Sequence, residues 1–181
     1  MSQNTGMPFE KIVFNIIDNL VKSNEFLVSN PNTKVCRKAS YYSKDRESYI
    51  KCDISVEKYL GNPDENSKLR PSIIVIIECK DYARSIPIDD VEEFHAKLQQ
   101  IGADNTKGIM ITRNGKFQKS ALVYAKSKGI ALARILPEDQ VHYIMHMMTN
   151  NFRFSQTNSL AAIRALTEEN YLSEHEEDFF H

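Results

Sequence analysis

The stretch from Ile73 to Ile77 constrains the fold more than any other, because its unbroken apolar run is followed at once by Glu78, Cys79 and Lys80. A short run of this kind, rich in β-branched residues, predicts a strand that is buried on both faces. Side chains two positions apart on a strand share a face. Glu78 and Lys80 are therefore expected to project together, while Cys79 points the other way.

The pattern on either side of this strand predicts an α/β fold. The order is αβββαβαβ with one further helix, and the three early strands most simply form a meander. We expect a mixed sheet flanked by helices on both faces. Residues 7–150 are expected to form one domain, and 151–181 a helical and acidic extension. The predicted helices are 9–23, 88–101, 116–128 and a last one from Pro137 through PEDQVHYIMHMM; the predicted strands are 34–42, 49–60, 72–80, 107–112 and 130–136.

Composition narrows the class of protein. Apolar residues make up 41% of the 181 and charged residues 26%, which is ordinary for a globular domain. No apolar stretch approaches the length of a membrane span. The first residues, MSQNTGMPFEK, have neither the basic nor the apolar region of a signal peptide, so we expect a cytoplasmic protein with reduced cysteines.

Glu78 and Lys80 at the strand end, together with a second carboxylate, would suit phosphoryl transfer. Asp53 is the best supplier, because it lies on the preceding predicted strand, in a hairpin able to bring it beside Glu78. Two carboxylates with a main-chain carbonyl suit Mg²⁺, a hard cation that prefers oxygen. Asp64 and Glu65 fall in a polar loop where geometry would be loose. The alternative is that Glu78 and Lys80 are only solvated charges at a strand end.

Residues 9–136 together resemble the Mrr-like branch of the PD-(D/E)xK nucleases, which have the restriction-endonuclease-like fold. The resemblance is carried by four segments in order: PFEKIV in the first helix, KCDISV in the second strand, IIECKDY in the central strand, and KGIMITRNGKFQKSALVYAKSKGIALARI downstream.

The resemblance implies a role for each matching residue. Asp53, Glu78 and the backbone carbonyl of Cys79 would ligate Mg²⁺, with Mn²⁺ as a substitute. Lys80 would position or polarise the attacking water. Glu10 would enter the site from the first helix, although an acid there also suits the helix dipole. The resemblance further implies a homodimer, since one site cuts one strand.

Basic residues in two regions are candidates for binding nucleic acid, although each lysine alone could be a solvated surface charge. The net charge of −1 does not by itself indicate that the chain binds nucleic acid. His142 and His146 have a spacing that binds zinc on a helix, but no third ligand is evident. The candidate nucleic-acid contacts are Arg37, Lys38, Lys44, Arg113, Lys116, Lys119 and Lys126.

The leading functional hypothesis is a Mg²⁺-dependent endonuclease that hydrolyses DNA phosphodiester bonds in restriction or phage defence. One alternative is a nuclease-fold module that does not cut and binds nucleic acid or a protein partner in a defence complex. A second alternative keeps the chemistry and makes RNA the substrate. A recognition or regulatory protein is a further expected partner, because no segment resembles a base-reading motif.

Overall fold

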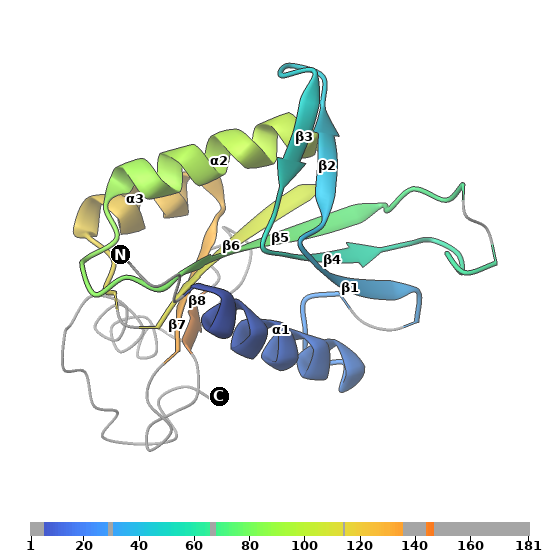
Figure 1. The fold of residues 1–181 in the computed structure, drawn as a ribbon, viewed down its shortest axis with the longest axis horizontal. Coiled ribbons are helices and arrows are strands. Elements are labelled where there is room, and N and C mark those ends of the chain that lie inside the picture. Colours follow the sequence, from blue (N-terminus) through green and yellow to red (C-terminus); the bar gives the residue numbers. More distant parts are fainter. Residues whose placement is uncertain (1–5, 29–30, 66–67, 114, 136–143, 147–181) are drawn as a thin grey trace. The chain divides into compact units, whose positions relative to one another are not determined.

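The computed structural model describes residues 6–28, 31–65, 68–113, 115–135 and 144–146. They form a mixed α/β fold (Figure 1), and the predicted fold class is confirmed. Hydrogen bonding orders the sheet strands β1-β4-β5-β6-β7-β8, and a separate ribbon pairs β2 with β3. The elements are α1 (Gly6–Lys22), β1 (Thr33–Arg37), β2 (Ser40–Ser43), β3 (Ser48–Lys51), β4 (Ile54–Lys58), β5 (Ile73–Lys80), α2 (Ile88–Gly102), β6 (Thr106–Thr112), α3 (Lys119–Lys128), β7 (Ala131–Arg134) and β8 (Ile144–His146).

The chain divides into two compact units. The first comprises Met1–Cys79 with Ala96–Gly108, and the second comprises Lys80–His95 with Ile109–His181. Helix α2 and strand β6 each contribute residues to both. No helix among the described residues is long and apolar enough to cross a membrane.

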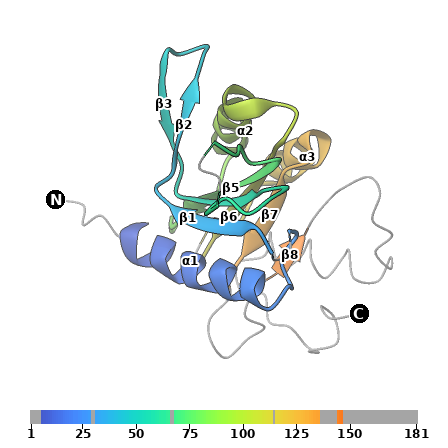
Figure 2. The same cartoon turned by 90° about the vertical axis from the view of Figure 1, so that its right-hand side faces the viewer.

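The first unit is built on the predicted meander. Strand β4 pairs antiparallel with β1 on one side and β5 on the other. Helix α1 packs against β1 through its apolar stripe, in which Phe9, Val13 and Ile17 are fully buried. The ribbon β2–β3 rises from the side of β1 and β4 opposite α1 (Figures 1 and 2). Strand β5 is buried from Ile74 to Glu78, as its apolar run predicts.

Each of the first two predicted strands is broken near its middle. The break falls at Lys38 and Ala39 in one strand and at Cys52 and Asp53 in the other. Two backbone hydrogen bonds bridge the break: Lys38 N–H donates to the carbonyl of Asp53, and Cys52 N–H donates to the carbonyl of Ala39, both at 2.9 Å. Lys38 adopts a φ of 54°, in the left-handed region. This bend separates the β2–β3 ribbon from the β1–β4 pair.

The second unit contains the parallel pair of β6 and β7, with α3 packed on β7. Helix α3 begins at Lys119, three residues later than predicted, because Phe117 lies in an isolated bridge with Ile86. Backbone bonds from Ile86 to Lys116 and from Gln118 to Ile86 hold that extended segment. The helix ends at Gly129, whose φ of 66° fits the predicted cap.

The predicted helix from Pro137 is wrong at its end. Residues Ile144–His146 form strand β8, which pairs antiparallel with β7. The segment takes this form because its backbone groups bond to the edge of β7, and such pairing overrides an apolar pattern that also fits a helix. His146 therefore lacks the helical spacing that a zinc pair with His142 requires, and His142 itself lies outside the described residues.

Candidate active site at the end of strand β5

Asp53 immediately precedes β4, and its side chain reaches the end of β5. Its Oδ2 atom accepts the backbone N–H of Cys79 at 2.9 Å. The side chain is 21% exposed, so the carboxylate is reachable from solvent. Asp53 is thus brought to the acidic end of the central strand, as the sequence predicts.

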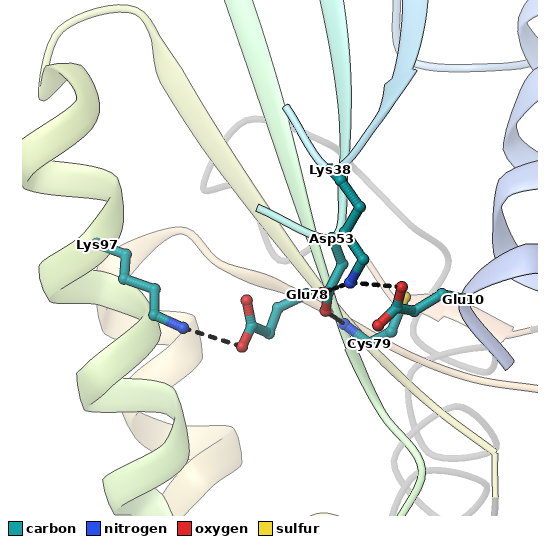
Figure 3. Close-up of polar contacts among 6 residues, drawn as sticks. All are labelled: Glu10, Lys38, Asp53, Glu78, Cys79 and Lys97. Carbon is teal, nitrogen blue, oxygen red and sulfur yellow. Dashed lines mark hydrogen bonds and ion pairs between the residues drawn. The ribbon is translucent and has the colours of Figure 1, made fainter. Parts of the chain in front are cut away.

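Glu10, Lys38 and Asp53 form an ion cluster in the first unit (Figure 3). The Lys38 ammonium lies 2.6 Å from Glu10 Oε2 and 3.1 Å from Asp53 Oδ1. Burial lowers the pKa of Lys38, but its hydrogen bonds to Glu10 and Asp53 and their negative charge outweigh burial, so the net shift is upward. The ammonium is therefore firmly charged near neutral pH, and two carboxylates share it.

Glu78 turns toward α2, while Asp53 turns toward Lys38 (Figure 3). Glu78 is 8% exposed, and its Oε1 atom accepts a hydrogen bond from the Lys97 ammonium at 3.1 Å. Sequence reasoning missed Lys97. The available signal was its position three residues after Phe94, on the flank of the buried face of the helix, where a long basic side chain can reach inward.

The pKa values of the Cys52 and Cys79 thiols are raised first by burial and then by the carboxylates around the strand end. Burial raises the pKa of Cys79, and the charges of Asp53, Glu10 and Glu78 raise it further. Burial, followed by the charge of Glu78, raises the pKa of Cys52 to about 12. These pKa shifts favour the protonated thiol at both positions near neutral pH.

Lys80 is the last residue of β5 and belongs to the second unit. Its side chain is 11% exposed, and its ammonium lies 3.9 Å from Asp90 Oδ1 on α2. The ammonium also lies 5.7 Å from the centre of the Tyr82 ring. A mostly buried ammonium held by an acid and an aromatic ring is a positioned group rather than a solvated charge.

The oxygen donors of the first unit fit a divalent cation in charge and chemistry. Glu10 and Asp53 already converge on one positive charge, and carboxylate oxygen is the ligand that Mg²⁺ prefers. Within the described ranges, however, no three His, Cys, Asp or Glu side chains are grouped so as to hold a metal ion. Glu78 is paired with Lys97 instead.

The basic residues predicted to bind nucleic acid lie in both units. In the first, Arg37 and Lys44 are exposed, and Arg37 lies over the Phe14 ring. In the second, Arg113 forms an ion pair of 2.9 Å with Asp81. The other predicted contacts in the second unit are Lys116, which is half-buried, and Lys119 and Lys126, which are exposed on α3.

Comparison with protein families matches residues 53–135 to a family described as restriction endonuclease (Mrr_cat). Residues 53–135 are therefore similar to the restriction endonuclease family. The match confirms the Mrr-like resemblance, and the chain carries a nuclease domain. The matched segment of the nuclease begins at Asp53 and includes Glu78, Cys79 and Lys80, whereas Glu10 and Lys38 precede it.

Two solved structures are similar to the nuclease. One, described as a protein of unknown function AF1548, is 14% identical with a TM-score of 0.48; the match covers 86% of this chain and 78% of the other. The second is Pyrococcus furiosus SfsA in complex with Ca²⁺, at 13% identity and a TM-score of 0.38, covering 76% and 61%. A comparison with curated proteins finds no match.

Proposed function

We propose that the chain is a Mg²⁺-dependent endonuclease that hydrolyses DNA phosphodiester bonds in restriction or phage defence. The observation that carries the proposal is the placement of the Asp53 carboxylate against the backbone of Cys79, inside a domain of the restriction endonuclease family. The hydrogen bond brings the Asp53 carboxylate to Cys79 at the end of β5, the residue next in sequence to Glu78, which supports a shared role for these two acids.

The roles proposed for the residues follow from their chemistry. Asp53, Glu78 and the backbone carbonyl of Cys79 would hold Mg²⁺ or Mn²⁺, with Glu10 as an additional carboxylate. The ion, when bound, would acidify a water molecule and stabilise charge on the phosphate. Lys80 would orient the attacking water and offset the negative charge that develops, since it is held by Asp90 and Tyr82.

Phosphate contacts are proposed for exposed basic residues of each unit. The β2–β3 ribbon adds Lys44 and an edge-to-face pair of Tyr42 and Tyr49, whose ring centres are 5.4 Å apart. Tyr42 is 53% exposed and Tyr49 is 70% exposed, so both rings are available for contact with a partner. Exposed aromatic and basic groups together are typical of nucleic-acid surfaces. A homodimer acting in the cytoplasm would have two active sites, one for each strand of a DNA duplex.

A plasmid-nicking assay tests the proposal. Wild-type protein is expected to convert supercoiled DNA to open-circular and linear forms with Mg²⁺ or Mn²⁺, and to be inactive with EDTA. Glu78→Gln and Lys80→Gln should each remove the activity, while Glu47→Gln and Lys107→Gln, which alter exposed residues, should retain it. Equal cutting by wild type and both site variants would point to another site or to a contaminant. A parallel digest of RNA determines the substrate.

A second candidate function is a module that binds nucleic acid or a protein partner without cutting. The observation that favours it is the pairing of the acidic residues with lysines: Lys38 pairs with both Glu10 and Asp53, and Lys97 pairs with Glu78. Calorimetric titration with Mn²⁺ discriminates the two functions. A binding-only module should show no ion site that depends on Glu78.

A further inference from the structure

The Lys38 ammonium occupies the place where two proposed metal-ligating groups converge. It lies 2.6 Å from Glu10 Oε2 and 3.1 Å from Asp53 Oδ1, whereas the other Asp53 oxygen, Oδ2, accepts the Cys79 N–H (Figure 3). An ammonium and a divalent cation seek the same oxygens. Coordination of an ion by these two carboxylates therefore competes with Lys38.

The backbone holds Lys38 in this place at a conformational cost. Its φ of 54° lies in the left-handed region, which is uncommon for a side chain other than Gly, Asn or Asp. The backbone N–H of Lys38 is fixed to the Asp53 carbonyl at 2.9 Å. Lys38 is therefore held in a strained conformation by the backbone of Asp53, whose carboxylate it also pairs with. Such strain is consistent with a functional need for the direction in which the Lys38 side chain points.

The ammonium is nonetheless able to leave. The Lys38 side chain is 45% exposed, whereas those of Glu10 and Asp53 are only 11% and 21% exposed. The cation can therefore swing into solvent on its flexible stem while both carboxylates stay in place. The next residues lead directly into the β2–β3 ribbon, whose exposed Lys44 and aromatic rings are the proposed nucleic-acid surface.

We propose that Lys38 is a resident counter-cation that keeps the carboxylates of Glu10 and Asp53 closed to a divalent ion until nucleic acid is bound. A backbone phosphate of the nucleic acid draws the ammonium away, and the two carboxylates are then open to the ion. The inference rests on the proposed function, because it assigns a regulatory role within the same site. Since coupling between two ligands is reciprocal, the ion also favours the phosphate-bound position of Lys38.

Calorimetric titration of the full chain with Ca²⁺ tests the proposal. The titration is done with and without a DNA duplex, and a gel run afterwards checks that the duplex was not cut. Lys38→Met should bind Ca²⁺ about tenfold more tightly than wild type without DNA, because the competing charge is gone. Lys38→Asn should do the same and suits the left-handed backbone. Duplex should tighten Ca²⁺ binding by wild type and leave both Lys38 variants nearly unchanged. The control Lys22→Met removes an exposed ammonium paired with Asp18 and should match wild type.

Two results would overturn the proposal. One is that both Lys38 variants, folded by circular dichroism, bind Ca²⁺ no more tightly than wild type. If wild type still nicks plasmid in that case, the gate fails while the proposed nuclease function stands. The other is that no form binds any divalent ion and none cuts DNA, which removes the metal site and the proposed function together.

Discussion

Asp53 and Cys79 are joined side chain to backbone, with Asp53 Oδ2 accepting the Cys79 N–H at 2.9 Å. Asp53→Asn keeps an oxygen able to accept that bond but loses the charge. We therefore expect an unchanged fold, and plasmid cutting lowered roughly 100-fold or more, since the charge is proposed to act on the metal. Nicking rates and circular dichroism measure the two effects. Asp64→Asn makes the same chemical change at an exposed loop position and should cut like wild type.

Lys97 is expected to stabilise the buried Glu78 carboxylate, to which it donates at 3.1 Å. Lys97→Met removes the ammonium but keeps a long apolar stem. The free energy of unfolding should fall by about 1–3 kcal/mol, because a largely buried carboxylate loses a charged hydrogen bond. Urea denaturation measures the loss. Lys107→Met, at an exposed position of β6, should change stability little; an equal loss in both variants would contradict the assignment.

Glu57 holds the base of the β2–β3 ribbon, because its two carboxylate oxygens accept the hydroxyls of Tyr41 and Tyr59, each at 2.5 Å. Glu57→Gln replaces one acceptor oxygen with a donor NH₂, so one phenol loses its acceptor. A loss of about 1–3 kcal/mol in unfolding free energy is expected. Thermal and urea denaturation check it against Glu47→Gln, an exposed change near the ribbon tip that should be nearly neutral.

Gly115 is required by a close approach of backbone atoms in the second unit. A Cβ at this position would lie 2.7 Å from the carbonyl oxygen of Arg84 and 3.2 Å from that of Tyr82. Gly115→Ala should therefore destabilise the fold by about 1–3 kcal/mol, since backbone cannot yield as a side chain can. Gly61→Ala is the matched control, because its Cβ would meet only a Leu69 methyl at 3.4 Å. Similar melting temperatures for both variants would show that the loop yields.

The ribbon tip, the turn at 44–47 between β2 and β3, is expected to contribute to nucleic-acid affinity through its positive charges. Lys44→Gln with Arg46→Gln should weaken binding to duplexes of any sequence and lower the salt slope by about one to two. Fluorescence anisotropy at several salt concentrations measures both. The control pair Lys22→Gln and Lys107→Gln makes the same change in net charge away from the ribbon. A tip variant with an unaltered slope would exclude phosphate contacts there.

The central strand and its acidic end were predictable, because an unbroken apolar run can be satisfied only by burial on both faces. The neighbouring position of Asp53 followed from the hairpin order. The bend at Lys38 was not predictable, because the segment CRKAS contains none of the residues that favour positive φ. Lys38 was expected to contact nucleic acid, and its ion pairs with Glu10 and Asp53 depend on that bend.

Other errors came from contacts between residues distant in sequence. Phe117 carries a helical pattern, but its pairing with Ile86 delays α3. Ile144–His146 also fits a helix by spacing, but pairing with β7 determines its conformation. Lys97 follows Glu78 by 19 positions, and only the placement of α2 brings the two together. Local patterns therefore located the strands, while partners across the fold determined helix ends and ion pairs.

The two hydrogen bonds from Tyr41 and Tyr59 to Glu57 have a consequence for how the ribbon could change in evolution. They anchor the root of the ribbon beside β4, whereas the turn at 44–47 is exposed and makes one backbone hydrogen bond of its own, from Glu47 to Lys44. Insertions or exchanges at that turn can accumulate without disturbing the carboxylates below. Under the proposed function, the turn at 44–47 could therefore change its contacts with nucleic acid, in evolution or by engineering, while the proposed metal-binding carboxylates stay in place.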